Sequence, residues 1–300
     1  MPTTINKICV DSRFRSFDSP STSNFKIELK ENILIPENYG AVITDICIPR
    51  SWYTVEYNNN KLYFAFQSQA LFAELYVVRQ LIITIPSRNY DINSLASTLK
   101  TTINTQVVLA RPNDFSSITP FNVLADVSTG TISIIPTNGL ELRYSHVYTD
   151  IDMQNMPASI WSGPSYVKDN LQSINSVLSN VGEVSAPLYQ KYSAMQPYVS
   201  GFINTLPYDS IFITCNQLSA FENIGPRGER NLLKKVLVNE PYGGLLNDNW
   251  INEYDFTNVG RLLLRTLEFK VQDPYGNELN LHGATVSFSV LLIDISSKIF

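Results

Sequence analysis

The C-terminal part of the chain carries the pattern that most restricts its fold. In residues 267–271 apolar side chains alternate with charged ones, and in residues 286–290 they alternate with serines. A period of two places one face of a strand in the core and the other in water. The intervening 273–277 contains a proline and a glycine, which suit a turn. The sequence therefore predicts two long antiparallel strands, whose apolar faces need a second sheet to cover them.

Further strand patterns gather near both ends of the chain. They occupy residues 25–29, 41–49 and 61–66 near the N-terminus, and 211–214 and 232–238 toward the C-terminus. The simplest arrangement pairs the first strands with the last. Eight strands in two antiparallel sheets describe a jelly roll. We therefore expect a mainly β protein, a single jelly-roll sandwich with an inserted, mixed β/α domain in the middle of the chain.

The middle of the chain has a different character. In residues 92–104 apolar side chains recur every three or four positions, which predicts a helix with Asp91 as its N-cap. Residues 121–127 and 131–135 predict a hairpin, and 169–180 a short helix. The expected domains are 1–75 (N-terminal strands and arm of the jelly roll), 76–200 (insertion) and 201–300 (C-terminal strands of the jelly roll).

Composition restricts the function classes. Charged residues make up 16% of the chain and the net charge is −5, without clusters of Lys and Arg. A dedicated nucleic-acid binder needs such clusters to neutralise phosphates, so we expect none. A tyrosine-rich surface with few charges suits protein–protein contact, and a β-rich composition explains it equally well. Cys9, Cys47 and Cys215 lack metal-ligand spacing and are expected to be small buried hydrophobes.

No catalytic motif is evident. The chain has neither the Gly-x-Ser-x-Gly elbow of serine hydrolases nor the Gly-Lys-Ser/Thr of a phosphate-binding loop. Asp248, Glu253 and Asp255 lie near Trp250, an arrangement found in glycosidase subsites and equally on solvated loops. We therefore expect no enzyme, with no catalytic residues, no cofactor and no bound metal; a glycoside hydrolase remains an alternative.

Seven short motifs lie in order along nearly the whole chain, at residues 11–15, 24–29, 46–54, 85–95, 224–229, 273–277 and 281–289. This series resembles penton proteins, the minor capsid proteins of virophages and Maverick/Polinton-type viruses. The resemblance implies a single jelly roll with an inserted outer domain, which forms homopentamers at the icosahedral five-fold vertices of the virion. It further implies packing against trimers of a double-jelly-roll major capsid protein, synthesis in the host cytoplasm and no catalytic residues.

Candidate interface residues follow from this expectation. Arginines of the N-terminal arm are suited to pair with carboxylates of this chain or of a neighbour, and loop aromatics dominate interface energetics. The insertion is expected to reach a host or helper-virus surface receptor. A carbohydrate- or receptor-binding jelly-roll module is the alternative function, because jelly rolls bind sugars through loop aromatics. The candidates are Arg13, Arg15, Tyr53, Tyr242 and Trp250.

Overall fold

The computed structural model shows a mainly β protein that divides into two compact units. Unit 1 combines Met1–Trp52 with Tyr208–Phe300, and unit 2 is the continuous segment Tyr53–Pro207. None of the helices described is long and apolar enough to cross a membrane. The structure describes residues 7–69, 76–110, 119–137, 142–156, 173–179, 198–206, 208–218, 223–251 and 255–296.

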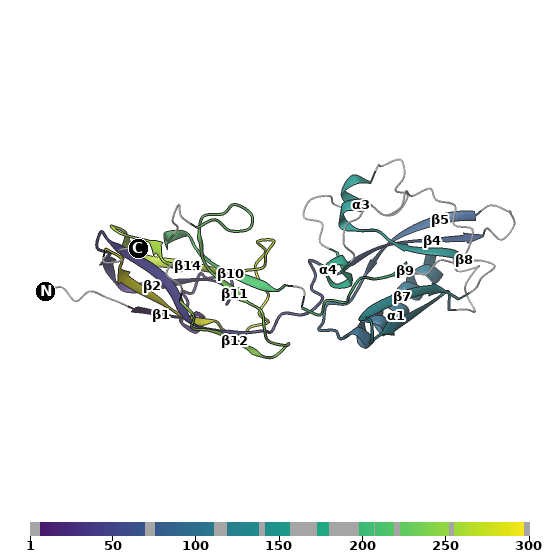
Figure 1. Ribbon diagram of the computed structural model, residues 1–300, viewed down its shortest axis with the longest axis horizontal. Helices are drawn as coiled ribbons and strands as arrows, with labels where there is room; N and C mark the ends of the chain where they lie inside the picture. The colour runs from purple at the N-terminus through teal and green to yellow at the C-terminus, as the bar shows by residue number, and fades with distance from the viewer. Residues whose placement is uncertain are drawn as a thin grey trace. The chain divides into compact units, whose positions relative to one another are not determined.

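Unit 1 is a sandwich of two antiparallel sheets (Figure 1). The first sheet has the order β1-β15-β3-β12, with the short β13 also on β3, and the second has the order β11-β10-β14-β2. The chain changes sheet at most of its strand connections, in the manner of a jelly roll; β10 and β11 are neighbours in the second sheet, and β12 and β13 both pair with β3. The elements are β1 (Lys7–Asp11), η1 (Ser12–Phe14), β2 (Asn24–Leu34), β3 (Tyr39–Pro49), β10 (Ser210–Cys215), η2 (Asn216–Leu218), β11 (Leu232–Leu237), β12 (Leu245–Asp248), β13 (Thr257–Asn258), β14 (Leu263–Gln272) and β15 (Ser287–Asp294).

The first strands of the chain pair with the last, as the sequence predicts. β2 is antiparallel to β14, with Phe25 opposite Phe269, and β15 lies between β1 and β3. The fold is therefore closed by contacts between the two ends of the chain.

The predicted pairing of the two C-terminal strands with each other is wrong. β14 and β15 belong to different sheets, and they meet across the core, where the rings of Phe269 and Phe288 are 5.0 Å apart and nearly perpendicular. The predicted turn does form, because the Asp273 carboxylate accepts hydrogen bonds from the backbone of Tyr275 and Asn277. Alternation identifies the buried face of a strand but not its neighbour, so it cannot distinguish a hairpin from a crossing between sheets.

The expectation of three buried cysteines holds for Cys215 alone. Cys47 is half-buried and Cys9 is exposed. Cys9 lies in the edge strand β1 between Ile8 and Val10, which point into the core, so the alternation of the strand turns the thiol outward.

In the part of unit 2 that the structure describes, there are two three-stranded antiparallel sheets and three helices. One sheet has the order β5-β4-β8, the other β6-β7-β9, and α1 lies against β6 and β7 (Figure 1). The elements are β4 (Lys61–Gln69), β5 (Tyr76–Thr84), α1 (Ile92–Ala110), β6 (Phe121–Asp126), β7 (Thr131–Pro136), β8 (Leu142–Val147), α3 (Asp150–Asn155), α4 (Asn175–Leu178) and β9 (Tyr198–Val199).

The predicted helix and hairpin of the middle segment are confirmed. The Asp91 carboxylate caps α1 by accepting a 2.7 Å hydrogen bond from the backbone N–H of Ser94, and the helix continues to Ala110. Leu95 and Leu99 from its apolar stripe belong to the same buried cluster as Phe64 of β4. β6 and β7 form the hairpin. Of the predicted helix at 169–180, α4 covers 175–178, and 169–172 and 180 lie outside the described residues.

The strand pattern at residues 61–66 belongs to unit 2, not to the jelly roll as the sequence suggested. This strand, β4, pairs with β5 and β8. Both of its faces are covered within unit 2, because Leu62 lies in the main core and Tyr63 packs with Met153 of α3. The units therefore divide after residues 52 and 207, whereas the sequence placed the divisions after 75 and 200.

Candidate functional site

The unit 1 sandwich has two lateral sides, which we call flanks. Each flank contains two edge strands, one from each sheet. We call β1, η1, residues 15–23 and β2 the first flank, and β11, β12, the connection 238–244 and residues 249–251 the second flank. On the first flank the chain crosses between the sheets, and Ser16 N–H donates to the Lys26 carbonyl of β2 (2.8 Å). On the second, Lys234 of β11 forms an ion pair with Asp248 of β12 (3.8 Å). Two strands separate the flanks in each sheet.

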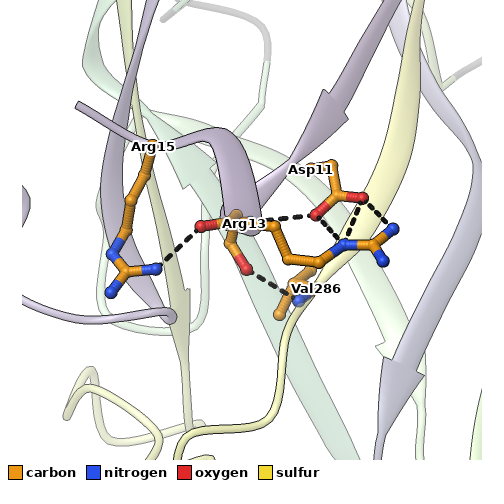
Figure 2. A network of polar contacts seen from close by, with 5 residues as sticks. Asp11, Arg13, Arg15 and Val286 are labelled. Carbon is orange, nitrogen blue, oxygen red and sulfur yellow. Dashed lines mark hydrogen bonds and ion pairs between the residues drawn. The ribbon is translucent and has the colours of Figure 1, made fainter.

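On the first flank, Ser12 anchors the turn that follows β1. Ser12 is fully buried; its N–H donates to the Val286 carbonyl and its Oγ accepts from the Val286 N–H, both at 2.9 Å. The Ser12 carbonyl accepts a 3.0 Å hydrogen bond from the Arg15 guanidinium (Figure 2). The turn is thus fixed to the segment preceding β15.

Arg13 pairs with a carboxylate of its own chain. Its Nε lies 3.0 Å from both oxygens of Asp11, and Nη2 lies 2.5 Å from Oδ2 (Figure 2). The Arg13 guanidinium lowers the pKa of the Asp11 carboxyl below its usual range, and the carboxylate raises the pKa of Arg13. Arg15, by contrast, contacts a carbonyl and pairs with no carboxylate among the described residues. Arg15 is exposed, so its guanidinium lies at the surface.

Two aromatic side chains next to these arginines are exposed. Phe14 is 79% exposed and Phe17 is fully exposed. Sequence analysis singled out Arg13 and Arg15 and missed both phenylalanines. The available signal was the placement of two phenylalanines in an arginine- and serine-rich run without strand or helix periodicity.

On the second flank, a buried lysine organises the segment after β12. The Lys234 side chain is 7% exposed, and Nζ lies 2.9 Å from the Asp255 carboxylate. Nζ also donates to the Trp250 carbonyl (2.8 Å), and the Trp250 N–H donates to Oδ1 of Asp248 (2.8 Å). The backbone of Trp250 is therefore fixed on both sides, while its indole side chain is 75% exposed.

The acidic cluster considered for glycoside hydrolysis belongs to this network. Asp248 and Asp255 both form ion pairs with Lys234, and Glu253 lies outside the described residues. The arrangement attaches Trp250 and Asp255 to β11. Among the residues that the structure describes, no group of three His, Cys, Asp or Glu side chains is placed to hold a metal ion.

The remaining candidates lie in different units. Tyr242 is in the connection between β11 and β12. The backbone of Arg50, the residue after β3, forms hydrogen bonds with that of Gly243 (2.8 Å) and that of Gly244 (2.9 Å) in this connection. Tyr53 begins unit 2, and its N–H donates to the Glu56 carboxylate (3.0 Å). The structure thus brings Tyr242 to the second flank with Trp250, places both arginines on the first flank, and leaves Tyr53 in the other unit.

Comparisons with known proteins bear on the fold. No protein-family model matches the chain, and no curated protein sequence matches it. Among solved structures, the crystal structure of the mavirus penton protein matches with a TM-score of 0.51 and 10% sequence identity. The match covers 97% of this chain and 99% of the mavirus chain. The fold of this protein is therefore penton-like over nearly its whole length.

Proposed function

We propose that this protein is a structural capsid protein that forms homopentamers at the five-fold vertices of an icosahedral virion and packs against trimers of a double-jelly-roll major capsid protein. The observation that supports this most is the likeness in fold to a viral penton protein along nearly the whole chain. The jelly-roll strand order of unit 1 agrees with it, since jelly rolls are common capsid domains.

The surface chemistry of unit 1 is compatible with a ring. A five-fold ring uses a heterologous interface, in which one surface of each copy meets a different surface of the next. Both flanks of unit 1 carry exposed aromatic side chains on fixed backbone, Phe14 on one and Trp250 on the other. Aromatic residues are enriched in protein interfaces, and a few residues, with Trp among the commonest, supply most of the binding energy.

The proposal extends to location and further partners. The protein is made in the host cytoplasm and resides at the capsid vertex. Unit 2 supplies contacts to a host or helper-virus surface receptor, and no catalytic step, cofactor or nucleic-acid contact is required of the chain.

The mass of the purified protein tests this function. Light scattering coupled to size-exclusion chromatography, on the protein alone and mixed with the major capsid protein of the same virus, is expected to give five times the chain mass or a vertex complex of that stoichiometry. Electron microscopy of the mixture is expected to show the protein at five-fold positions. A monomer under both conditions, absent from assembled shells, would refute the proposal.

A further inference from the structure

We propose that the open edge of β1 pairs with β1 of a second copy of this chain, antiparallel and centred on Cys9. The pairing joins the first sheets of the two copies into one continuous sheet. It goes beyond the proposed capsid function and does not depend on it, because it relates two copies by a two-fold axis rather than neighbours in a ring. Three observations support it: the direction of the backbone groups of β1, its sequence and its charges.

Alternate residues of β1 turn their backbone groups away from the sheet. β1 pairs with β15 on one side and is an edge strand on the other. The N–H of Ser12, just after β1, donates to the Val286 carbonyl (2.9 Å), so the even-numbered residues of β1 are the ones bonded to β15. The odd-numbered residues face outward, and their backbone groups have no hydrogen-bond partner in the part of the chain that the structure describes. These outward residues are Lys7, Cys9 and Asp11.

The other edge strands of unit 1 are less suited to adding a strand. At β2, the Lys26 carbonyl accepts from the Ser16 N–H (2.8 Å), and the Lys26 N–H donates to Ser19 Oγ (3.0 Å). β12 has four residues, and its Leu245 carbonyl accepts from the Asn247 side chain (3.2 Å). β11 has a register shift against β10. Covered, short and irregular edges discourage strand addition, whereas β1 keeps one register over all five of its residues.

An antiparallel copy centred on Cys9 pairs all three outward residues at once. Cys9 lies opposite the partner's Cys9, and Lys7 lies opposite the partner's Asp11, in both directions. Each of these pairs exchanges two backbone hydrogen bonds. Two-fold registers centred elsewhere in β1 pair fewer of the outward residues, and those centred on Lys7 or Asp11 place like charges opposite each other, which destabilises neighbouring strands. The sequence of β1 therefore favours one register.

The charges along this edge alternate in sign across the two-fold axis. Lys7 forms an ion pair with Asp45 of β3 (2.7 Å), and Asp11 forms one with Arg13 (2.5 Å). Pairing brings the two ion pairs into one row: Asp45, Lys7, the partner's Asp11 and the partner's Arg13. Arg15, the next charged residue, contacts a backbone carbonyl of the turn. An edge lysine ordinarily opposes strand addition, but here it meets a carboxylate.

The contact is small, which sets its strength. A standard interface has about 20–30 residues a side, whereas β1 has five. Ile8 and Val10 are buried in the core of their own copy, so pairing covers little further apolar surface. Main-chain hydrogen bonds supply the affinity, as in other cases of strand addition. We therefore expect a reversible dimer whose population rises with protein concentration.

The thiol of Cys9 tests the register directly. Cα atoms of a hydrogen-bonded antiparallel pair are about 5.5 Å apart, a distance that a disulfide spans. We would replace Cys47 and Cys215 by alanine in the full chain, oxidise with copper phenanthroline and follow the linked dimer by non-reducing electrophoresis. The matched control adds Cys9→Ala and Lys235→Cys, which moves the thiol to an exposed position on β11. The Cys9 protein is expected to link about ten times faster, because pairing raises the effective concentration of the thiols.

Two charge variants test complementarity. Lys7→Asp makes both ends of β1 acidic, and Asp11→Lys makes both ends basic. Each variant alone is expected to dimerise about tenfold more weakly, because like charges then lie opposite each other. An equimolar mixture of the two, one isotopically light and one heavy, is expected to regain the affinity as light–heavy pairs in native mass spectrometry. Damage to the ion pairs with Asp45 and Arg13 inside each copy is not repaired by mixing.

The outcomes separate this inference from the proposed function. If Cys9 links no faster than the control thiol, or if light–heavy pairs form no more readily than either variant alone, the β1 contact is wrong and the capsid function stands. If the free protein is a ring, the same pairing joins copies of different rings, and both measurements apply unchanged. A protein that meets both expectations but is absent from capsid vertices supports the contact and refutes the proposed function.

Discussion

Replacing Lys234 with methionine is expected to destabilise unit 1 and to loosen the segment that carries Trp250. The substitution keeps the length and apolar character of the side chain but removes the ammonium group. Three interactions end with it: the ion pairs with Asp255 and Asp248, and the hydrogen bond to the Trp250 carbonyl.

The magnitude follows from the burial of these groups. Removing one partner of a buried ion pair costs about 3–5 kcal/mol, because the remaining charge is left without compensation. The Asp248 and Asp255 side chains are 23% and 30% exposed, so water partly solvates them once Lys234 is gone. We therefore expect the free energy of unfolding of unit 1 to fall by about 2–3 kcal/mol, which corresponds to a lower melting temperature by about 5–10 °C.

Tryptophan fluorescence measures this change in unit 1. Trp52 is 1% exposed and reports its unfolding, whereas Trp250 is exposed already in the folded state. Trp161, which belongs to the segment of unit 2, is replaced by phenylalanine in every protein compared. The matched control is Lys235→Met, because Lys235 is adjacent in β11 but exposed, and its effect is expected to stay within about 0.5 kcal/mol.

A second measurement separates lost charge compensation from lost packing. In the Lys234→Met protein the carboxylates of Asp248 and Asp255 have lost their ammonium partner. Changing both residues to asparagine removes these two charges, and we expect the triple variant to regain about half of the stability lost by Lys234→Met. If Lys234→Met is as stable as the Lys235→Met control, then the network does not hold this flank together, and the argument for a fixed Trp250 backbone is wrong.

Three further predictions concern both units. Phe64→Ala removes a ring that packs edge-on against Phe121 at 5.3 Å in the core of unit 2, and chemical denaturation is expected to show a loss of about 3–5 kcal/mol. Burial lowers the pKa of His146 below its ordinary 6.5, so the imidazole binds a proton more tightly in the unfolded chain than in the folded one. The free energy of unfolding of unit 2 is therefore expected to fall as the pH decreases through about 6.5. In thermal melts from pH 7.5 to 5, His146→Gln is expected to weaken this dependence of stability on pH. A Cβ at Gly260 would lie 1.8 Å from the Glu37 carbonyl oxygen, so Gly260→Ala is expected to lower the stability of unit 1 by about 1–3 kcal/mol in calorimetry, and an unchanged melting temperature would contradict the close approach.

Local pattern predicted the elements better than their partners. The stripe of Leu95 and Leu99 identified α1, and the alternation around Phe269 identified β14, because both patterns depend on which side of a single element faces the core. The same alternation assigned β4 to the jelly roll and paired β14 with β15, and the structure shows neither. Which strand lies beside another depends on contacts between residues distant in the chain.

For the candidate interface residues too, the sequence predicted some properties and only the structure showed the others. Sequence reasoning selected Arg13, Arg15 and Trp250 by residue type, but it had no means of separating Arg13, which pairs with Asp11, from Arg15, which does not. It also missed Phe14, because the exposure of an apolar side chain depends on what the rest of the fold leaves uncovered.

The sequence by itself determined that this chain is rich in strands with one buried face and that a helix and a hairpin interrupt them. Only the tertiary structure decided which strands form the two edges of the sandwich, and it placed the turn after Asp11 and the segment after Asn247 at opposite ends of one row. The physical reason is that periodicity records how each residue divides between core and water, whereas strand order and register arise from backbone hydrogen bonds and packing between distant segments, which no local pattern contains.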